Sequence, residues 1–260
     1  MVENILYIVT KKNLDWRCDV FMNIAVIFAG GTGQRMNSVS VPKQFLVVHG
    51  KPIIVHTIEK FQNCDEIDSI VVVCLEGYIN NLYELKGKYN LSKITKVVPG
   101  GESGQLSIYN GLVAAKEISK STKDIVLIHD GVRPIIDDIT IKNNIACVKQ
   151  NGSAITVAKS VETVLVLSDE KINNVVNRDM CYLGRAPQSF YLNEILENHN
   201  KALKQNITNF IDSAMLMKHF GKELFIVNGP VNNIKITTAM DFFMFKAYLD
   251  AKESDQIKLV

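Results

Sequence analysis

Continuous apolar runs and stretches with apolar residues at helical spacing alternate along most of the chain. Runs at residues 24–28 and 70–75 are typical of strands buried on both faces. Residues 52–62 between them have the spacing of a helix. Further helices are predicted at 78–89, 105–118 and 138–150, and further strands at 96–99, 124–129 and 153–157. This alternation predicts an α/β fold with a Rossmann-like, mostly parallel sheet, helices on both faces, and ligands at the carboxyl ends of the strands.

The pattern changes after residue 158. Two extended segments, 161–167 and 172–178, flank turn-like residues and predict a projecting β-hairpin. An ordinary edge hairpin is one interpretation, but a two-stranded arm with this many apolar residues is marginal without a packed face. We therefore expect residues 158–185 to form a dimerisation arm. A helix around 213–220, a strand at 224–228 and a helix at 239–252 complete the pattern.

Length and composition favour one domain. The chain has 260 residues, 47% of them hydrophobic, which is enough for one large core. We assign residues 23–252 to this domain, 1–22 to an N-terminal appendage without a secretory apolar region, and 253–260 to a tail. No apolar run reaches the roughly 18 residues that span a bilayer, so no membrane partner is expected.

Charge and cysteine content exclude several function classes. The net charge is +2 with both signs intermixed, so no basic field indicates nucleic-acid binding. The five cysteines are scattered and include no C-x-x-C pair, which argues against a zinc site and against a disulfide framework. Reduced thiols in a cytoplasmic protein are the simplest explanation.

A glycine-rich turn directly follows the first strand. Gly30, Gly31 and Gly33 would allow backbone N–H groups to approach an anion closely, and Arg35 and Lys43 follow with positive charge. A phosphate cradle is predicted, although such turns also occur as simple connections.

Two common nucleotide motifs do not fit this turn. The P-loop needs a lysine directly after its last glycine, and none is present. The dinucleotide fingerprint would place Met36 where a small residue is required.

Two further groups follow predicted strands. Gly101, Glu102 and Ser107 could hold a base, with a simple helix start capped by Ser103 as the alternative. Asp130 could bind Mg²⁺ shared with phosphates, and Arg133 could pair with a phosphate; an Asp–Arg ion pair that closes a turn is the alternative.

Several motifs together resemble those of the methylerythritol-phosphate/ribitol-5-phosphate cytidylyltransferases, a family of sugar-phosphate nucleotidyltransferases. The resemblance covers residues 23 to about 249. It rests on A-G-G-x-G-x-R-M at 29–36, P-K-Q-F at 42–45, H-D-x-x-R-P at 129–134, P-Q-S-F at 187–190 and N-I-K-I-T at 233–237. G-G-T-G and H-D-x-V-R-P are more similar to the ribitol-5-phosphate branch.

The resemblance implies transfer of CMP from CTP to a polyol phosphate, with release of pyrophosphate. D-ribitol 5-phosphate is the favoured acceptor, and 2-C-methyl-D-erythritol 4-phosphate is the alternative. A protein that binds CTP without turnover is an alternative of another class. Mg²⁺ or another divalent cation is the implied cofactor, and a homodimer is the implied assembly.

The resemblance also implies roles for individual residues. The catalytic residues are Arg35, Lys43 and Lys235. The nucleotide-binding residues are Ala29, Gly30, Gly31, Thr32, Gly33, Gly101, Glu102, Ser107 and Asp130, and Asp130 is also the metal ligand. The acceptor-binding residues are Arg133, Thr163, Arg178 and Asp212, with Thr163 and Arg178 supplied by the partner subunit.

The chain departs from the family pattern near these sites. The residues are Glu102 for an aspartate, Gly104 for an arginine, Ala186 for a threonine, and Arg185 as an unexpected charge. Glu162 before Thr163 also stands where the family has an aspartate.

Overall fold

The structure is a computed structural model that describes residues 21–31 and 41–254. Residues 1–20, 32–40 and 255–260 lie outside this description, and with them most of the predicted appendage and tail.

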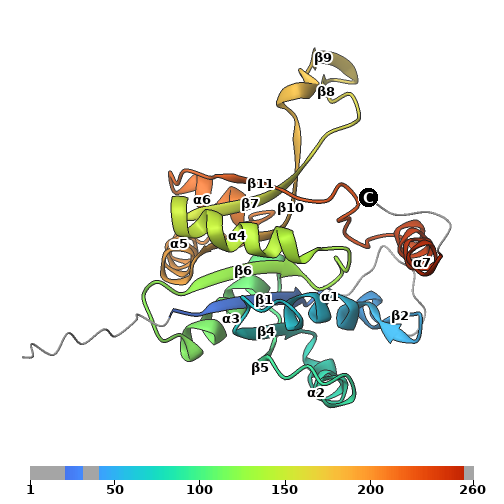
Figure 1. Cartoon of the computed structure of the whole chain (residues 1–260). Coiled ribbons are helices and arrows are strands. Elements are labelled where there is room, and N and C mark those ends of the chain that lie inside the picture. The colour runs from blue at the N-terminus through green and yellow to red at the C-terminus, as the bar shows by residue number, and fades with distance from the viewer. Residues whose placement is uncertain (1–20, 32–40, 255–260) are drawn as a thin grey trace, which may run out of the picture.

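A seven-stranded sheet forms the centre of the molecule, in the order β11-β7-β10-β6-β1-β4-β5 (Figure 1). Its strands are β1 (Asn23–Ala29), β4 (Ser69–Cys74), β5 (Ile94–Pro99), β6 (Ile125–Asp130), β7 (Ser153–Lys159), β10 (Tyr182–Tyr191) and β11 (Ile226–Asn228). Neighbours are parallel, except that β10 runs antiparallel to both β6 and β7. The predicted mostly parallel sheet is confirmed, with β10 as a strand that the sequence pattern did not predict.

Helices cover both faces of the sheet, as predicted (Figure 1). They are α1 (Ile53–Gln62), α2 (Ile79–Lys88), α3 (Gly104–Ile118), α4 (Asp138–Asn151), α5 (Leu192–Lys204), α6 (Ser213–His219) and α7 (Ala239–Glu253). One core contains side chains of α3, α5 and α6, and the other contains those of α1, α2 and α4. Helix α5 was not predicted, although its buried residues Leu192, Ile195 and Ala202 share one side at helical spacing.

The central strands are covered on both faces. Every residue of β4 and β6 is buried, as their continuous apolar runs predicted. Helix α3 lies close against this layer at Gly111, where an added Cβ would lie 2.5 Å from Val26 Cγ1 and 2.7 Å from Val73 Cγ2. This close packing holds the middle of α3 against β1 and β4.

A third apolar cluster fixes the segment before α7. Ile236 and Phe245 pack with Val132, Ile135 and Ile53, next to the short hairpin of β2 (Val47–Val48) and β3 (Lys51–Pro52). The backbone N–H of Ile236 also donates to the carbonyl of Val132 at 2.9 Å. Lys235 is therefore positioned by its neighbour in sequence, which belongs to the core.

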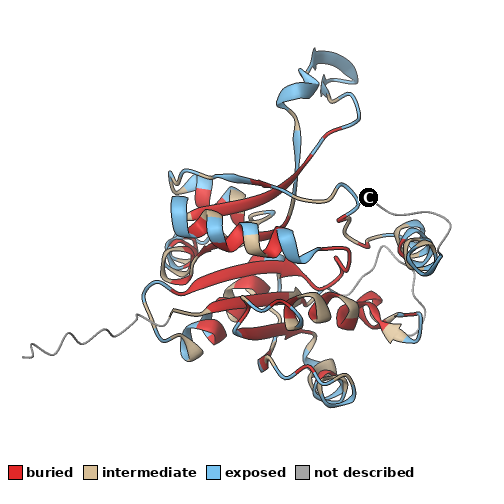
Figure 2. Ribbon diagram, viewed as in Figure 1, coloured by how far each residue is buried: buried red, intermediate tan, exposed pale blue. Residues whose placement is uncertain are grey.

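The segment between β7 and β10 projects from the sheet as the predicted hairpin (Figure 1). Its strands β8 (Leu165–Ser168) and β9 (Lys171–Val175) are shorter than expected. Asp169 and Glu170 have positive φ values of 48° and 63°, which suit a two-residue hairpin turn. Every residue of β8 and β9 is exposed, as Figure 2 shows. The first residues of β10 continue the central sheet, where Tyr182 pairs with Lys159.

No helix in the described part of the chain is long and apolar enough to cross a bilayer.

Candidate active site

A cavity of about 610 Å³ opens where β1, β4 and β6 end. Three groups of residues predicted separately meet there, because parallel strands end at the same edge of a sheet. Of the predicted site residues, those lining the cavity are Ala29, Gly30, Gly31, Lys43, Gly101, Glu102, Ser107, Asp130 and Lys235.

The other predicted residues lie elsewhere or outside the description. Thr32, Gly33 and Arg35 belong to residues 32–40, which the structure does not describe. Arg133 lies behind Asp130 and contacts it. Thr163 and Arg178 are exposed in the segment between β7 and β10, and neither lines the cavity. Asp212 caps α6, where its carboxylate accepts from the N–H of Met215 at 2.8 Å.

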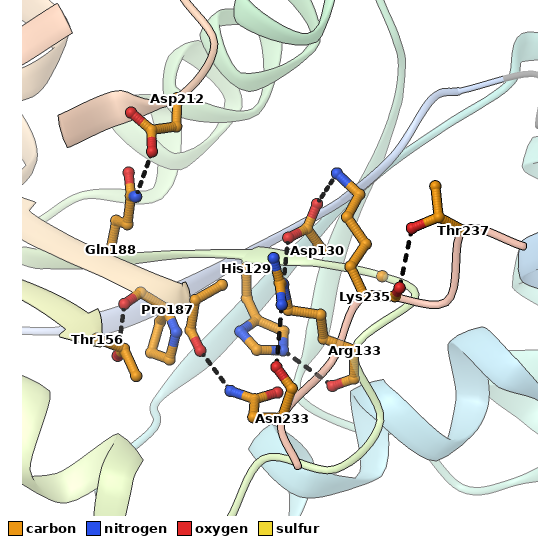
Figure 3. A network of polar contacts seen from close by, with 12 residues as sticks. His129, Asp130, Arg133, Thr156, Pro187, Gln188, Asp212, Asn233, Lys235 and Thr237 are labelled. Atoms are coloured by element: carbon orange, nitrogen blue, oxygen red, sulfur yellow. Dashed lines mark hydrogen bonds and ion pairs between the residues drawn. The ribbon is translucent and has the colours of Figure 1, made fainter. Parts of the chain in front are cut away.

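Asp130 is the centre of the charged groups at this edge (Figure 3). Its Oδ2 accepts a hydrogen bond from Nε of Arg133 at 2.7 Å. Its Oδ1 lies 2.6 Å from Nζ of Lys235. The Asp–Arg ion pair that was the alternative interpretation is therefore formed, and Asp130 also lies on the cavity wall.

The two cations keep Asp130 ionised. Burial alone would raise the pKa of this carboxyl, but the charges and hydrogen bonds of Lys235 and Arg133 outweigh burial and lower its pKa to about 2. The neighbouring His129 is fully buried, and burial lowers its pKa to about 4. Its Nε2 lies 3.1 Å from the carbonyl of Arg133 and therefore carries the proton that it donates. His129 thus braces the turn as a neutral ring.

The two glycine loops pack directly against each other. A Cβ at Gly30 would lie 3.0 Å from Oγ of Ser107, and a Cβ at Gly100 would lie 3.2 Å from Cα of Gly30. Ser107 accepts a hydrogen bond from the N–H of Gly101 at 3.0 Å and thereby fixes this loop. Ser103 caps α3, as the alternative interpretation expected, and its hydroxyl donates to the carbonyl of Thr208 at 2.6 Å. The loop is therefore both a capped helix start and a wall of the cavity.

A short 3₁₀ helix, Lys43–Phe45, carries Lys43 to the cavity. Gln44, which sequence reasoning did not single out, is buried and donates from Nε2 to the carbonyl of Ala29 at 2.7 Å. A longer contact of 3.3 Å reaches the carbonyl of Gly31. Gln44 therefore holds Lys43 and the glycine turn in one arrangement. Gln44 belongs to the P-K-Q-F motif, but the motif did not predict a role for this residue.

Two amide side chains that were also missed connect distant segments at the site. Asn233 is fully buried; its Nδ2 donates to the carbonyl of Ala186 at 2.8 Å, and its backbone carbonyl accepts from Nη1 of Arg133 at 3.0 Å. Gln188 donates from Nε2 to Oδ2 of Asp212 at 2.9 Å (Figure 3). Both residues occur in quoted motifs, P-Q-S-F and N-I-K-I-T, but their partners are far away in sequence.

Comparison with known proteins identifies the family. The model of the IspD family, 2-C-methyl-D-erythritol 4-phosphate cytidylyltransferase, matches residues 23–251. The chain belongs to this family.

Individual members of this family are similar over nearly the whole chain. A ribitol-5-phosphate cytidylyltransferase of Streptococcus agalactiae serotype Ia is 52% identical, covering 91% of this chain and 99% of the relative. A ribitol-5-phosphate cytidylyltransferase of Vibrio parahaemolyticus is 48% identical with the same coverage. The crystal structure of 4-diphosphocytidyl-2C-methyl-D-erythritol synthase from Anaerococcus prevotii has a TM-score of 0.76 and 28% identity, over 88% of this chain and 96% of that one. The chain is thus an enzyme of the nucleotidyltransferase class, as predicted.

Proposed function

We propose that this cytidylyltransferase transfers CMP from CTP to a polyol phosphate, with D-ribitol 5-phosphate as the preferred acceptor. The observation that carries the proposal is the cavity in which two glycine loops face Lys43, Lys235 and Asp130. The names of the two relatives at 52% and 48% identity support the acceptor. The second candidate acceptor is 2-C-methyl-D-erythritol 4-phosphate, which the family description names.

In this proposal the reaction depends on positioning and charge neutralisation. An oxygen of the acceptor phosphate attacks the α-phosphorus of CTP, and the bond from that phosphorus to the pyrophosphate oxygen breaks. The attacking group is already an oxyanion, so no general base is needed. Lys43 and Lys235 neutralise the triphosphate and the transition state, and Arg35 is the third cation assigned to this task. Lys235 is suited to it because its side chain is 40% exposed, so its ammonium group can contact a phosphate in the cavity as well as Asp130.

The glycine loops hold the nucleotide in this proposal. Residues 29–31 receive the phosphates through backbone N–H groups, and Thr32 and Gly33, which follow in the sequence, are assigned the same role. Gly101 and Glu102 line the same cavity, where the exposed Glu102 carboxylate accepts from the exocyclic amine of cytosine in this proposal. Rates with ATP, GTP and UTP beside CTP test this assignment.

Asp130 is the proposed ligand of the divalent cation. Among the described residues, no group of three or more His, Cys, Asp or Glu side chains is placed to hold a metal ion. A single carboxylate on the cavity wall suits Mg²⁺, which binds one or two carboxylates and takes further oxygens from substrate phosphates and water. The cation would supply additional neutralisation of the phosphates. Loss of pyrophosphate release on chelation, and its return with added Mg²⁺, tests the requirement.

The arm completes the acceptor site of a second subunit in this proposal. Apolar side chains along the arm are exposed, among them Val161 (67%), Leu167 (62%), Ile172 (61%) and Val175 (59%). A second copy related by two-fold symmetry would cover them and bring Thr163 and Arg178 to its partner's acceptor phosphate. Asp212 of the chain that supplies the cavity would bind acceptor hydroxyls.

Pyrophosphate release with a panel of acceptors tests the main proposal. CTP alone, CTP with D-ribitol 5-phosphate, CTP with other pentitol phosphates and CTP with 2-C-methyl-D-erythritol 4-phosphate are compared by kcat/KM. The largest value is expected with D-ribitol 5-phosphate. A larger value with 2-C-methyl-D-erythritol 4-phosphate would identify that compound as the acceptor. If the protein binds CTP but turns over none of the acceptors, the proposed reaction is refuted.

Complementation tests the shared site. A Lys43→Ala chain and an Arg178→Ala chain, each inactive alone, are mixed and allowed to exchange subunits. One site of the mixed dimer then carries both changes and the other carries neither, so activity should return. Mixing Lys43→Ala with a Lys43→Ala, Arg178→Ala double variant provides the control that cannot recover. If folded, exchanging variants do not complement, each chain uses its own arm.

A further inference from the structure

Strand β10 contains a bulge where it passes the active site. Gly184 pairs with Val157 and Gln188 pairs with Ile155, so residues 185–187 of β10 lie opposite Thr156 alone. Extra residues in a bulge interrupt the alternation of side chains and re-aim them. The carbonyl of Pro187 accepts from Oγ1 of Thr156 at 2.7 Å, as Figure 3 shows. Nδ2 of Asn233 donates to the carbonyl of Ala186, so the bulge is fixed by two hydrogen bonds.

Arg185 is the first residue of this bulge, and it is half-buried. Its Nε is fully covered and has no hydrogen-bond partner, and no ion pair joins its guanidinium to any carboxylate of the described residues. A guanidinium carries five donors and keeps its charge at all relevant pH values. Covering such a group without a partner costs free energy. The covered Nε is therefore a donor that a ligand bound at this edge can satisfy.

The surroundings of Arg185 are those of an anion site. In the pairing of β10 with β6, Gln188 lies opposite Ile128, so the residues before Gln188 run past the end of β6, where Asp130 lies. Asn233 contacts Ala186 through its side-chain amide and Arg133 through its backbone carbonyl, so one residue links the bulge that carries Arg185 to Arg133. Burial and the charge of Arg133 both lower the pKa of Arg185. Asp130 pairs with Arg133 and Lys235 but not with Arg185, so the positive charge at this edge exceeds the negative charge, and a phosphate dianion would balance it.

We propose that Arg185 binds the phosphate of the acceptor, together with Arg133, at the end of β6. This inference rests on the proposed function, because it names the group that receives the acceptor phosphate. A planar fork fixed by a bulge orients a tetrahedral phosphate by two parallel hydrogen bonds. In this role Arg185 is a specificity residue for phosphorylated acceptors.

The test compares Arg185→Gln and Arg185→Lys with wild type and with Lys218→Gln, which removes an exposed cation on α6. Arg185→Gln should raise KM for the polyol phosphate about 10- to 100-fold and leave KM for CTP within about twofold, as expected for one charge-assisted contact. Arg185→Lys should lie between Arg185→Gln and wild type, and Lys218→Gln should match wild type. Without ligand, Arg185→Gln should melt no lower than wild type, because it removes an unpaired cation.

Binding of inorganic phosphate gives a second readout that does not depend on turnover. Calorimetric titration is carried out with α,β-methylene CTP at saturation, so that the nucleotide's own phosphate contacts are occupied. Weaker phosphate binding by Arg185→Gln supports the inference. Unchanged phosphate binding overturns the inference. This holds even if KM for the acceptor rises, because Arg185 would then contact the acceptor's hydroxyls and not its phosphate. If Arg185→Gln has a lower melting temperature and raises both KM values equally, Arg185 has a structural role and the inference is also overturned. Absence of wild-type turnover on every polyol phosphate refutes the proposed function alone.

Discussion

Replacing Asp130 by asparagine tests whether the charged group at the end of β6 is held by its carboxylate. The side chain is buried, and the change removes the negative charge that faces both Arg133 Nε and Lys235 Nζ. The pKa of Asp130 falls from 3.8 to about 2 on folding. At about 1.4 kcal/mol per pKa unit this corresponds to roughly 2 kcal/mol of stability at neutral pH. Arg133 is also left buried without a counter-charge, and breaking such a pair costs about 3–5 kcal/mol.

We therefore expect Asp130→Asn to lower the free energy of unfolding by about 2–4 kcal/mol. In a chain of this size the melting temperature would fall by roughly 5–15 °C. The control is Glu197→Gln, which breaks the exposed 2.7 Å pair with Lys201 on α5 and should leave the melting temperature almost unchanged.

The pH dependence of this difference identifies its cause. A carboxyl with a depressed folded pKa stabilises the protein above its unfolded pKa, and this contribution is lost as the pH falls through the folded value. The gap between wild type and Asp130→Asn should therefore be complete above about pH 4 and shrink toward about pH 2. Melting curves of both variants across this range measure it. A gap no larger than that of Glu197→Gln at pH 7 would refute the reasoning.

Two further predictions concern the cavity wall. Lys43→Ala and Lys235→Ala should each lower kcat by on the order of 10²–10³, as the loss of one charged donor to a transition state typically does. Their melting temperatures should fall less than that of Asp130→Asn. Pyrophosphate release close to the wild-type rate would show that the lysine has another role. Gln44→Ala should lose the two contacts to the glycine turn, lower stability by about 1–3 kcal/mol and raise KM for CTP more than KM for the acceptor. An unchanged KM for CTP would separate Gln44 from the nucleotide site.

The sequence allowed the cavity to be predicted because its parts follow strands. Asp130 and the first glycine loop come after continuous apolar runs, and the second glycine loop follows the short strand β5. Parallel strands bring such ends together. Lys43 and Lys235 were found through motifs alone, since both lie in segments without a strong periodic pattern. The arm was recognised from its β-branched segments and turn, and its strands proved shorter than the pattern suggested.

Strand β10 was missed for a physical reason. Gly184 and Pro187 interrupt its apolar pattern, and both residues normally argue against a strand. They are tolerated because the chain bulges there, and the bulge depends on Thr156 and Asn233, two residues far away in sequence. The contacts of Gln188 with Asp212 and of Arg133 with Asn233 were beyond prediction for the same reason.

The ionisation of the site predicts where the pH dependence of catalysis originates. Asp130, with a pKa of about 2, and His129, with a pKa of about 4, both keep one charge state above pH 5. A phosphate monoester loses its second proton near pH 6, so the acceptor itself changes charge in this range. We expect kcat/KM for the acceptor to rise between pH 5 and 7 with a midpoint of about 6. A phosphonate analogue with a higher second pKa should move this midpoint upward by the same amount, because the titrating group belongs to the substrate. A midpoint that stays in place when the acceptor is changed would assign the titration to the enzyme and contradict a mechanism without a general base.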